Sequence, residues 1–267
     1  MLTQKGSRTP EEMRECLEQR PRREARAPHS TYRVQLHAGF TFADAEVVLP
    51  YLKSLGIGDL YSSPVFEARP GSMHGYDVTR HDRLNPELGG EESFARFAGR
   101  LRELGMGLLL DIVPNHMGVG NDSLWWQDVL ENGRASRYAN YFDIEWEPLN
   151  PDMRNKLLLP ILGSQYGEEL EAKKIQVAGV DGQLRAQYFD HLMPLAPRSM
   201  PAVFPDAELD EMGVPQSFRD ILRETAHIPP HEATDPMLIA QRRRQMEELR
   251  PRLRAALLSE TMREPLG

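Results

Sequence analysis

Side chains that could exchange protons or ligate a metal are crowded into one short stretch, residues 73–90. They are His74, Tyr76, Asp77, His81 and Asp82. Their spacing matches no helix-face ligand pattern such as H-E-x-x-H, which disfavours a transition-metal site. A polar loop whose groups satisfy one another is the simpler interpretation, and both interpretations remain open from these residues alone.

Two further polar clusters follow apolar segments. Gln35 and His37 lie at the end of the apolar segment "STYRVQL". Asp111, Asn115 and His116 lie toward the end of the segment "GLLLDIVPNH". The carboxyl ends of parallel strands meet on one face, so three such clusters predict a site there. Taken singly, each has a structural explanation: backbone bonding for Asp111, and turn chemistry after a proline for Asn115 and His116.

The segments before these clusters alternate between strand and helix patterns. Strands are predicted at 30–36, 57–66 and 106–116, helices at 41–56 and 89–105, and a long loop at 67–88. This order predicts consecutive βαβ units and a parallel sheet.

Local signals refine the two helices. Val48, Leu52 and Leu55 should share the buried face of the first helix, with Pro50 kinking or restarting it. In the second helix the predicted stripe is Phe94, Phe97, Leu101 and Leu104. "LKSLGIGDLYSSPV" and "LRELGMGLLLDIVP" share one plan, in which a helix ends at Gly56 or Gly105 and an apolar strand follows. The apolar "GLLLDIV" predicts a strand that is covered on both faces.

The pattern changes after His116. Residues 117–205 contain the strand-like pieces "KLLLPIL", "KKIQVAG" and "LRAQYFD", and "VDGQ" between the last two predicts a hairpin. We expect an inserted β-rich subdomain here and a helical segment over 206–267. Its apolar stripe is Met246, Leu249, Leu253 and Leu257, and Pro251 is a predicted kink. Trp125 and Trp126 cannot share a helix face, so one could offer a ring to a sugar, although both could be core.

Composition excludes several classes. The net charge of −8 gives no reason to expect nucleic acid or an anionic membrane, and the basic run at 20–26 is typical of a solvated tail. Residues 1–29 are expected to form a disordered or partly helical tail without a secretory signal. Cys16 is the only cysteine, which excludes an intramolecular disulfide and fits the cytoplasm.

Longer motifs carry a family resemblance. "GSMHGYDVTRHDRLNPELGG" followed by "GLLLDIVPNHM" resembles the α-amylase superfamily, and "DIVPNH" looks like its signature at the end of barrel strand three. More narrowly, "YSSPVFEARPGSMHGYDV", "WWQDVLENGRASRYANYFDIEW" and "KLLLPILGSQYGEELE" resemble the maltooligosyl trehalose synthase family. The resemblance runs from about residue 30 to about residue 260.

The resemblance implies an α/β fold: the first three βα units, over 30–116, of a (β/α)8 TIM barrel. It implies an isomerase-type glucosylmutase that converts the reducing-end α-1,4 bond of a maltodextrin into an α,α-1,1 bond, with no cofactor and no metal. It also implies substrate-binding roles. Tyr76 would stack under the sugar and His116 would bond its hydroxyls, while the pocket wall would be supported by Asp111, Asn115, His74 and Asp77.

The sequence departs from the family pattern in its catalytic groups. The family's nucleophile and acid/base come from strands four and five, and a retaining mechanism needs two carboxyls ~5–5.5 Å apart. "FRD" at 218–220 lies in a helical context and is no substitute. We therefore predict no catalytic residue here and a chain inactive alone, with a separate chain as a possible partner. The alternatives are a non-catalytic maltodextrin-binding remnant and part of another glucan hydrolase.

Overall fold

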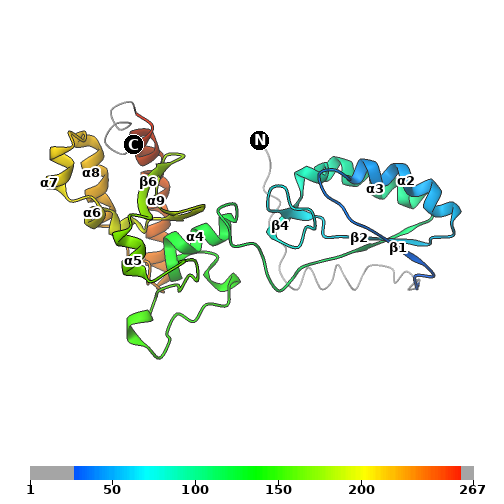
Figure 1. Ribbon diagram of the computed structural model, residues 1–267, viewed down its shortest axis with the longest axis horizontal. Coiled ribbons are helices and arrows are strands. Elements are labelled where there is room, and N and C mark those ends of the chain that lie inside the picture. The colour runs from blue at the N-terminus through cyan, green and yellow to red at the C-terminus, as the bar shows by residue number, and fades with distance from the viewer. Residues whose placement is uncertain (1–26, 260–267) are drawn as a thin grey trace. The chain divides into compact units, whose positions relative to one another are not determined.

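The computed structural model describes residues 27–259, apart from the side chains of residues 206–208. They form two compact units, one from the residues up to Val65 with Leu84–Ile112, and one from Phe66–Arg83 with the residues after Ile112 (Figure 1). Most of the expected tail, with Cys16 and the basic run at 20–26, lies outside the described residues. No helix in the described ranges is both long and apolar enough to cross a bilayer.

The first unit is built on a parallel sheet of order β1-β2-β5. Thr31 pairs with Asp59 and Asp59 with Gly107, so all three strands run in register in one direction. The predicted parallel βαβ order is confirmed. The elements are β1 (Thr31–Val34), α2 (Phe42–Ser54), β2 (Asp59–Ser62), a 3-10 turn (Pro86–Leu88), α3 (Gly90–Glu103) and β5 (Gly107–Leu110).

Both helices end in the same Schellman motif, which explains the repeated sequence plan. Gly56 and Gly105 adopt left-handed φ values of 85° and 61°. After α2, the N–H of Gly56 donates to Lys53 and that of Ile57 donates to Leu52. The N–H groups of Gly105 and Met106 do the same at the end of α3. Each motif ends its helix and leads the chain into the next parallel strand.

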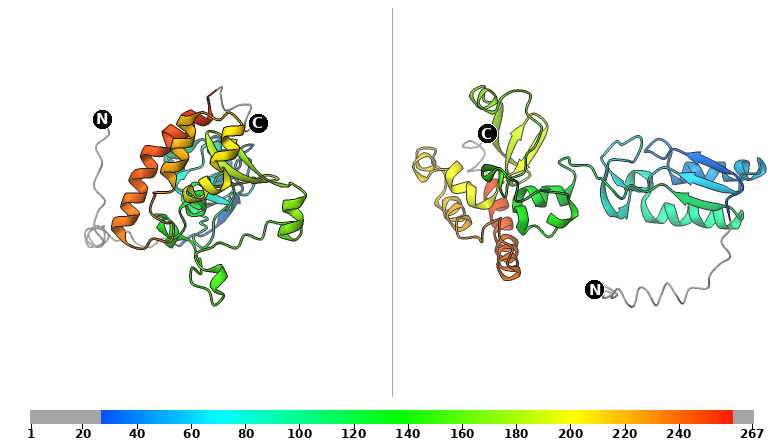
Figure 2. Two further views of the ribbon diagram at one scale, coloured as in Figure 1. Left: turned by 90° about the vertical axis from the view of Figure 1, so that its left-hand side faces the viewer. Right: turned by 90° about the horizontal axis from the view of Figure 1, so that it is seen from below.

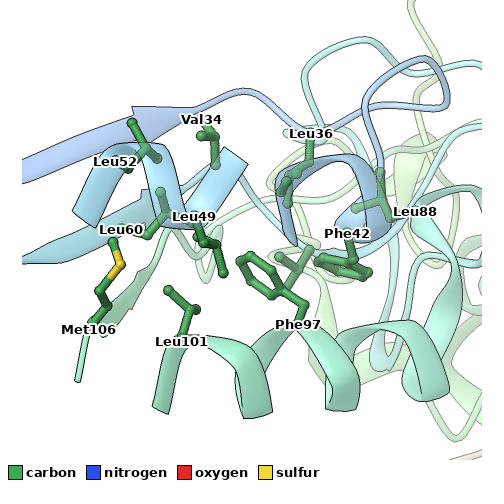
Figure 3. Close-up of a cluster of buried hydrophobic side chains, with 12 residues drawn as sticks. Val34, Leu36, Phe42, Leu49, Leu52, Leu60, Leu88, Phe97, Leu101 and Met106 are labelled. Atoms are coloured by element: carbon green, nitrogen blue, oxygen red, sulfur yellow. The ribbon is translucent and has the colours of Figure 1, made fainter. Parts of the chain in front are cut away.

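The core of this unit lies between the sheet and its two helices, which pack side by side (Figure 3). The buried side chains of this core are Val34, Leu36, Phe42, Ala45, Leu49, Leu52, Leu60, Val65, Leu88, Phe97, Leu101 and Met106. The predicted stripe of α3 is confirmed, since Phe94 and Leu104 pack partly buried against this cluster.

Two expectations about this core are wrong. The buried face of α2 is Phe42, Ala45, Leu49 and Leu52, whereas Leu55, at the C-cap, is 55% exposed. Strand β5 is not covered on both faces, since Leu109 and Leu110 are 40% and 42% exposed at the edge of the sheet. Helix α2 continues through Pro50.

The second unit opens with a hairpin where a long loop was predicted. Strand β3 (Phe66–Ala68) pairs with β4 (Val78–Leu84). The sequence of β4, VTRHDRL, has no alternation of apolar and polar residues that would predict a strand, because it is polar along most of its length. The stretch around Tyr76 is therefore the tip of a hairpin.

An antiparallel sheet of order β6-β7-β8 forms the centre of the rest of this unit. The predicted hairpin at "VDGQ" is confirmed, and Asp181 and Gly182 take the positive φ values of a type I′ turn. "KLLLPIL" is not a strand: Leu158 is 79% exposed and the segment has no ladder partner. The strands are β6 (Ile175–Val180), β7 (Gln183–Tyr188) and β8 (His191–Pro194).

Helices complete the second unit, and α9 packs beside α8 and β7 (Figure 2). The predicted stripe of α9 is confirmed, with Met246, Leu249 and Leu253 buried and Leu257 packed against them. The helix continues through Pro251. The helices are α4 (Leu124–Asn132), α5 (Tyr166–Glu171), α6 (Met200–Val203), α7 (Asp206–Glu211), α8 (Gln216–Thr225) and α9 (Pro236–Leu257).

Candidate functional site

A cavity of about 480 Å³ lies in the second unit, where β4, the segment after β5 and the N-terminal turn of α4 meet. This volume is within the usual range for small-ligand sites. The lining residues are His81, Pro114, Asn115, His116, Met117, Val119, Trp125, Tyr141, Phe142 and Asp143.

His81 is fixed at one side of this cavity by β4. Its Nε2 lies 3.0 Å from the carbonyl oxygen of Val113, and because a carbonyl only accepts, that nitrogen carries the proton. The imidazole also lies 6.3 Å from the ring of Phe66 and 6.1 Å from that of Trp125. His81 is thus a positioned polar group between two aromatic rings.

Helix α4 presents the aromatic wall. Ser123 caps the helix by accepting from the N–H of Trp126, which fixes the position of the first turn. Trp125 stacks on Tyr138 at 5.2 Å and meets Tyr141 edge-to-face at 5.1 Å. Both tryptophans of α4 are half-buried, so neither is a simple core residue.

Asn115 and His116 form the polar rim. Both are exposed, and Nδ1 of His116 lies 2.9 Å from the amide oxygen of Asn115. Of the described residues that line the cavity, Asp143 is the one carboxylate. The cavity therefore offers ring faces and hydrogen-bonding groups, which suit the flat faces and hydroxyls of a sugar, and it lacks a pair of carboxyls.

Three of the predicted site residues lie on the β3–β4 hairpin but do not line this cavity. Nδ1 of His74 accepts from the N–H of Tyr76 at 3.0 Å, and the two rings stack at 6.0 Å. Asp77 accepts from the hydroxyl of Ser72 and lies 3.8 Å from His74. The hairpin tip is thus a self-bonded polar turn that still presents Tyr76 half-buried.

Asp111 belongs to the first unit. It accepts a hydrogen bond of 3.0 Å from the hydroxyl of Tyr61 on β2. In the same unit, Gln35 accepts from Arg33 and His37 accepts from the N–H of Gly39. The polar groups at the strand ends of the first unit therefore form hydrogen bonds with residues of the same unit.

Charge along β4 is balanced locally. Arg80 donates two bonds to Asp82, at 2.9 and 2.7 Å. These bonds lower the pKa of the Asp82 carboxyl, and they raise the pKa of Arg80. His81 lies between the two in sequence and is the residue of β4 that lines the cavity.

Sequence reasoning missed Tyr141 and Phe142. Tyr141 ends a 3-10 turn (Ala139–Tyr141) and Phe142 follows it, and neither belongs to a periodic pattern that would predict a cavity wall. The stretch "RYANYFDIEW" does contain four aromatic residues among polar ones, and that density was the available signal.

Comparison with known proteins first identifies the class. The family model "Alpha amylase, catalytic domain" matches residues 46–170, which include β2, α3, β5 and the lining residues of the described cavity. Together with the structural matches below, it assigns a TIM-barrel-type α/β fold. Residues 46–170 are thus similar to the catalytic domain of the α-amylases.

Within that class, the particular relatives are maltooligosyl trehalose synthases. A putative enzyme of that name from Mycobacterium tuberculosis is 46% identical over 177 residues, covering 64% of this chain and 22% of the relative. A crystal structure titled maltooligosyl trehalose synthase matches with a TM-score of 0.58 at 38% identity, covering 63% of this chain and 22% of that one. The synthase from Arthrobacter ramosus matches with a TM-score of 0.56 at 44% identity, covering 63% and 21%.

The resemblance drawn from the sequence motifs is confirmed over this part of the chain. An intracellular maltogenic amylase from Bacillus subtilis is also 38% identical, but only over 104 residues. The chain spans about a fifth of the length of the synthases that it matches.

Proposed function

We propose that this chain contributes the N-terminal part of a maltooligosyl trehalose synthase and binds maltooligosaccharides. The reaction is an intramolecular transglucosylation, in which the reducing-end α-1,4 linkage becomes an α,α-1,1 linkage. The observation that carries the proposal is the 46% identity over 177 residues with the mycobacterial relative.

The βα units of the first unit fit the start of a barrel. Three parallel strands in the order β1-β2-β5, joined by α2 and α3, are the arrangement expected of the first three barrel strands. Residues 117–205 then correspond to an inserted subdomain and residues 206–267 to a helical segment. Nucleophile and acid/base carboxylates would come from barrel strands beyond these three.

The cavity of the second unit supports the binding role. Trp125 and Tyr141 offer ring faces, and His81, Asn115 and His116 offer hydrogen-bonding groups around one space. In this proposal His116 and Asn115 bond sugar hydroxyls, while Tyr76 stacks on a sugar and His74 and Asp77 hold the hairpin tip beneath it. Asp111 holds the end of β5 in shape through Tyr61.

Reconstitution tests the activity. The chain is co-expressed with a second chain that carries the remaining barrel strands of a related synthase. The pair should form trehalose-ended product from maltohexaose, detected by NMR of the anomeric protons, with each chain alone as the control. A soluble 1:1 complex that leaves maltohexaose unchanged overturns the proposed activity.

Binding is tested separately on this chain. Calorimetry with maltohexaose should show saturable binding, and Trp125→Ala should weaken it about five- to thirtyfold, because loss of a stacking ring removes roughly 1–2 kcal/mol. Trp146→Ala is the matched control, since Trp146 does not line the cavity. Equal affinity in both variants and the parent chain contradicts a role for this cavity.

A further inference from the structure

One buried cation in the second unit has no direct counter-ion. Arg242, on α9, is 2% exposed. Its Nε donates to the amide oxygen of Asn132 at 3.0 Å, and its two terminal nitrogens donate to the carbonyls of Pro229 at 2.6 Å and Glu131 at 3.2 Å. All three acceptors are neutral, so the bonds satisfy donors without neutralising the charge.

A buried charge in such surroundings needs an explanation. Buried ions in proteins are normally paired or coordinated, because removing them from water is expensive. Among the described residues, no carboxylate lies within 4.0 Å of this guanidinium. Burial accordingly lowers the pKa of Arg242 below its usual value.

Arg242 lines a small polar cavity of about 190 Å³. The charged groups around it are Arg137, Arg242, Arg243, Arg250, Asp128 and Glu247. Positive groups therefore outnumber negative ones by four to two.

Pairing leaves three of these arginines and the two carboxylates to set the charge of the cavity. Arg250 is paired with Glu131, and Asp128 accepts from Asn132 and from the hydroxyl of Ser136. Within the described part of the chain, neither Arg137 nor Arg243 has a carboxylate partner. Both are exposed, whereas Arg242 lies at the buried side.

We propose that this cavity binds a phosphate-type dianion, as free inorganic phosphate or as the phosphoryl group of a sugar phosphate. Guanidinium groups bind phosphate oxygens through paired charge-assisted hydrogen bonds, which a neutral sugar cannot match. A volume of about 190 Å³ lies below the range of whole-ligand pockets and suits one phosphoryl group. The bound dianion supplies the counter-charge that Arg242 lacks, and Arg137 and Arg243 close over it.

The fluorescence of Trp125 offers a way to detect anion binding at this cavity. The guanidinium of Arg137 lies 4.9 Å from the ring centre of Tyr138, and that ring stacks on Trp125. If the side chain of Arg137 moves to bind an anion, the surroundings of the stacked Tyr138 and Trp125 rings change. Tryptophan fluorescence should therefore follow binding.

The full chain is titrated with inorganic phosphate and, separately, with glucose 6-phosphate. Binding is measured by calorimetry and by tryptophan fluorescence, and the ionic strength is held constant within each titration. We expect saturable binding that weakens as sodium chloride is raised, because exposed charges are screened. Tighter binding of glucose 6-phosphate identifies a sugar phosphate as the ligand, and equal binding identifies the phosphoryl group alone; either result supports the site.

Three arginine variants supply the contrast. Arg137→Gln and Arg243→Gln should each weaken binding at least about tenfold, the effect of losing a charged hydrogen bond. Arg244→Gln is the matched control, because Arg244 is exposed on α9 next to Arg243 but does not line the cavity. Circular dichroism checks that each variant is folded. Absence of saturable binding of both probes, or equal weakening by Arg244→Gln, overturns the proposal.

Discussion

At the scale of single residues, Arg242 also joins parts of the second unit that are far apart in sequence. It connects α9 to the end of α4 and to the segment at Pro229. Arg242→Met should lower the free energy of unfolding by about 2–4 kcal/mol, because it leaves buried oxygens without donors. Urea unfolding measures this change, with Arg244→Met as the exposed control. An unchanged unfolding midpoint would show that these contacts add nothing to stability.

Asp44 gives a pH-dependent prediction at the same scale. The N–H and the hydroxyl of Thr41 both donate to its Oδ2, at 2.8 and 2.7 Å. These bonds lower the pKa of Asp44 in the folded state from its ordinary value of 3.8. The stability that they give is therefore complete above about pH 4 and is lost as pH falls through the lower folded pKa.

The experiment compares Asp44→Asn with the parent chain by urea unfolding between pH 2 and 7. The parent should be more stable at neutral pH, and the difference should shrink at the acid end of this range. Glu46→Gln removes a carboxylate from the same helix and should leave the parent profile intact. A difference between parent and Asp44→Asn that stays constant across the range contradicts the capping role.

Individual site residues were only partly predictable. Asn115 and His116 were found because they follow an apolar strand pattern, and the structure places both at the rim of a cavity. Tyr141 and Phe142 were missed, since only tertiary packing brings them to Trp125 and the cavity. Asp111 was grouped with His116 by sequence proximity, but the two lie in different units.

At the scale of elements, the β6–β7 hairpin is held against α9 through Gly182. This glycine has φ of +73°, and a Cβ there would lie 2.3 Å from Cγ and 3.2 Å from Cα of Arg254. Gly182→Ala should destabilise the chain by about 2–4 kcal/mol, because left-handed backbone strain adds to overpacking against the helix. Thermal or urea unfolding measures it.

Gly213 is the matched control for this prediction. It has φ of +67°, but a Cβ there would meet nothing within 4 Å. Gly213→Ala should therefore show only the backbone term, about 1–2 kcal/mol. If both variants lose the same stability, the contact with Arg254 does not hold the hairpin.

Elements with strong local signals were predicted and those stabilised by distant partners were not. The Schellman ends of α2 and α3 were readable because Gly56 and Gly105 follow amphipathic helices. Strand β4 was hidden, because its residues alternate weakly and its ladder partner β3 is only three residues long. "KLLLPIL" has a strand composition but no neighbouring strand, so propensity alone gave the wrong answer.

At the scale of the whole molecule, each unit contains its own hydrophobic core. One core joins β1, β2, α2 and α3, and the other joins β7, α8 and α9. The sequence predicted the first core well, because the spacing of apolar residues in its helices and strands indicates which side chains are buried. It predicted the second only in part, since the packing of α8 and α9 on β7 depends on contacts across many residues.

These separate cores predict separate unfolding. Phe97 and Phe218 are matched probes, because they are 0% and 1% exposed at the centres of the two cores. Phe97→Ala and Phe218→Ala should each remove about 3–5 kcal/mol, the usual loss for a buried phenylalanine. Hydrogen exchange followed by mass spectrometry locates the effect: Phe97→Ala should raise exchange in α2 and α3, and Phe218→Ala should raise it in α8 and α9. Faster exchange in all four helices of either variant would mean that the two cores unfold as one, against the separation of their buried side chains.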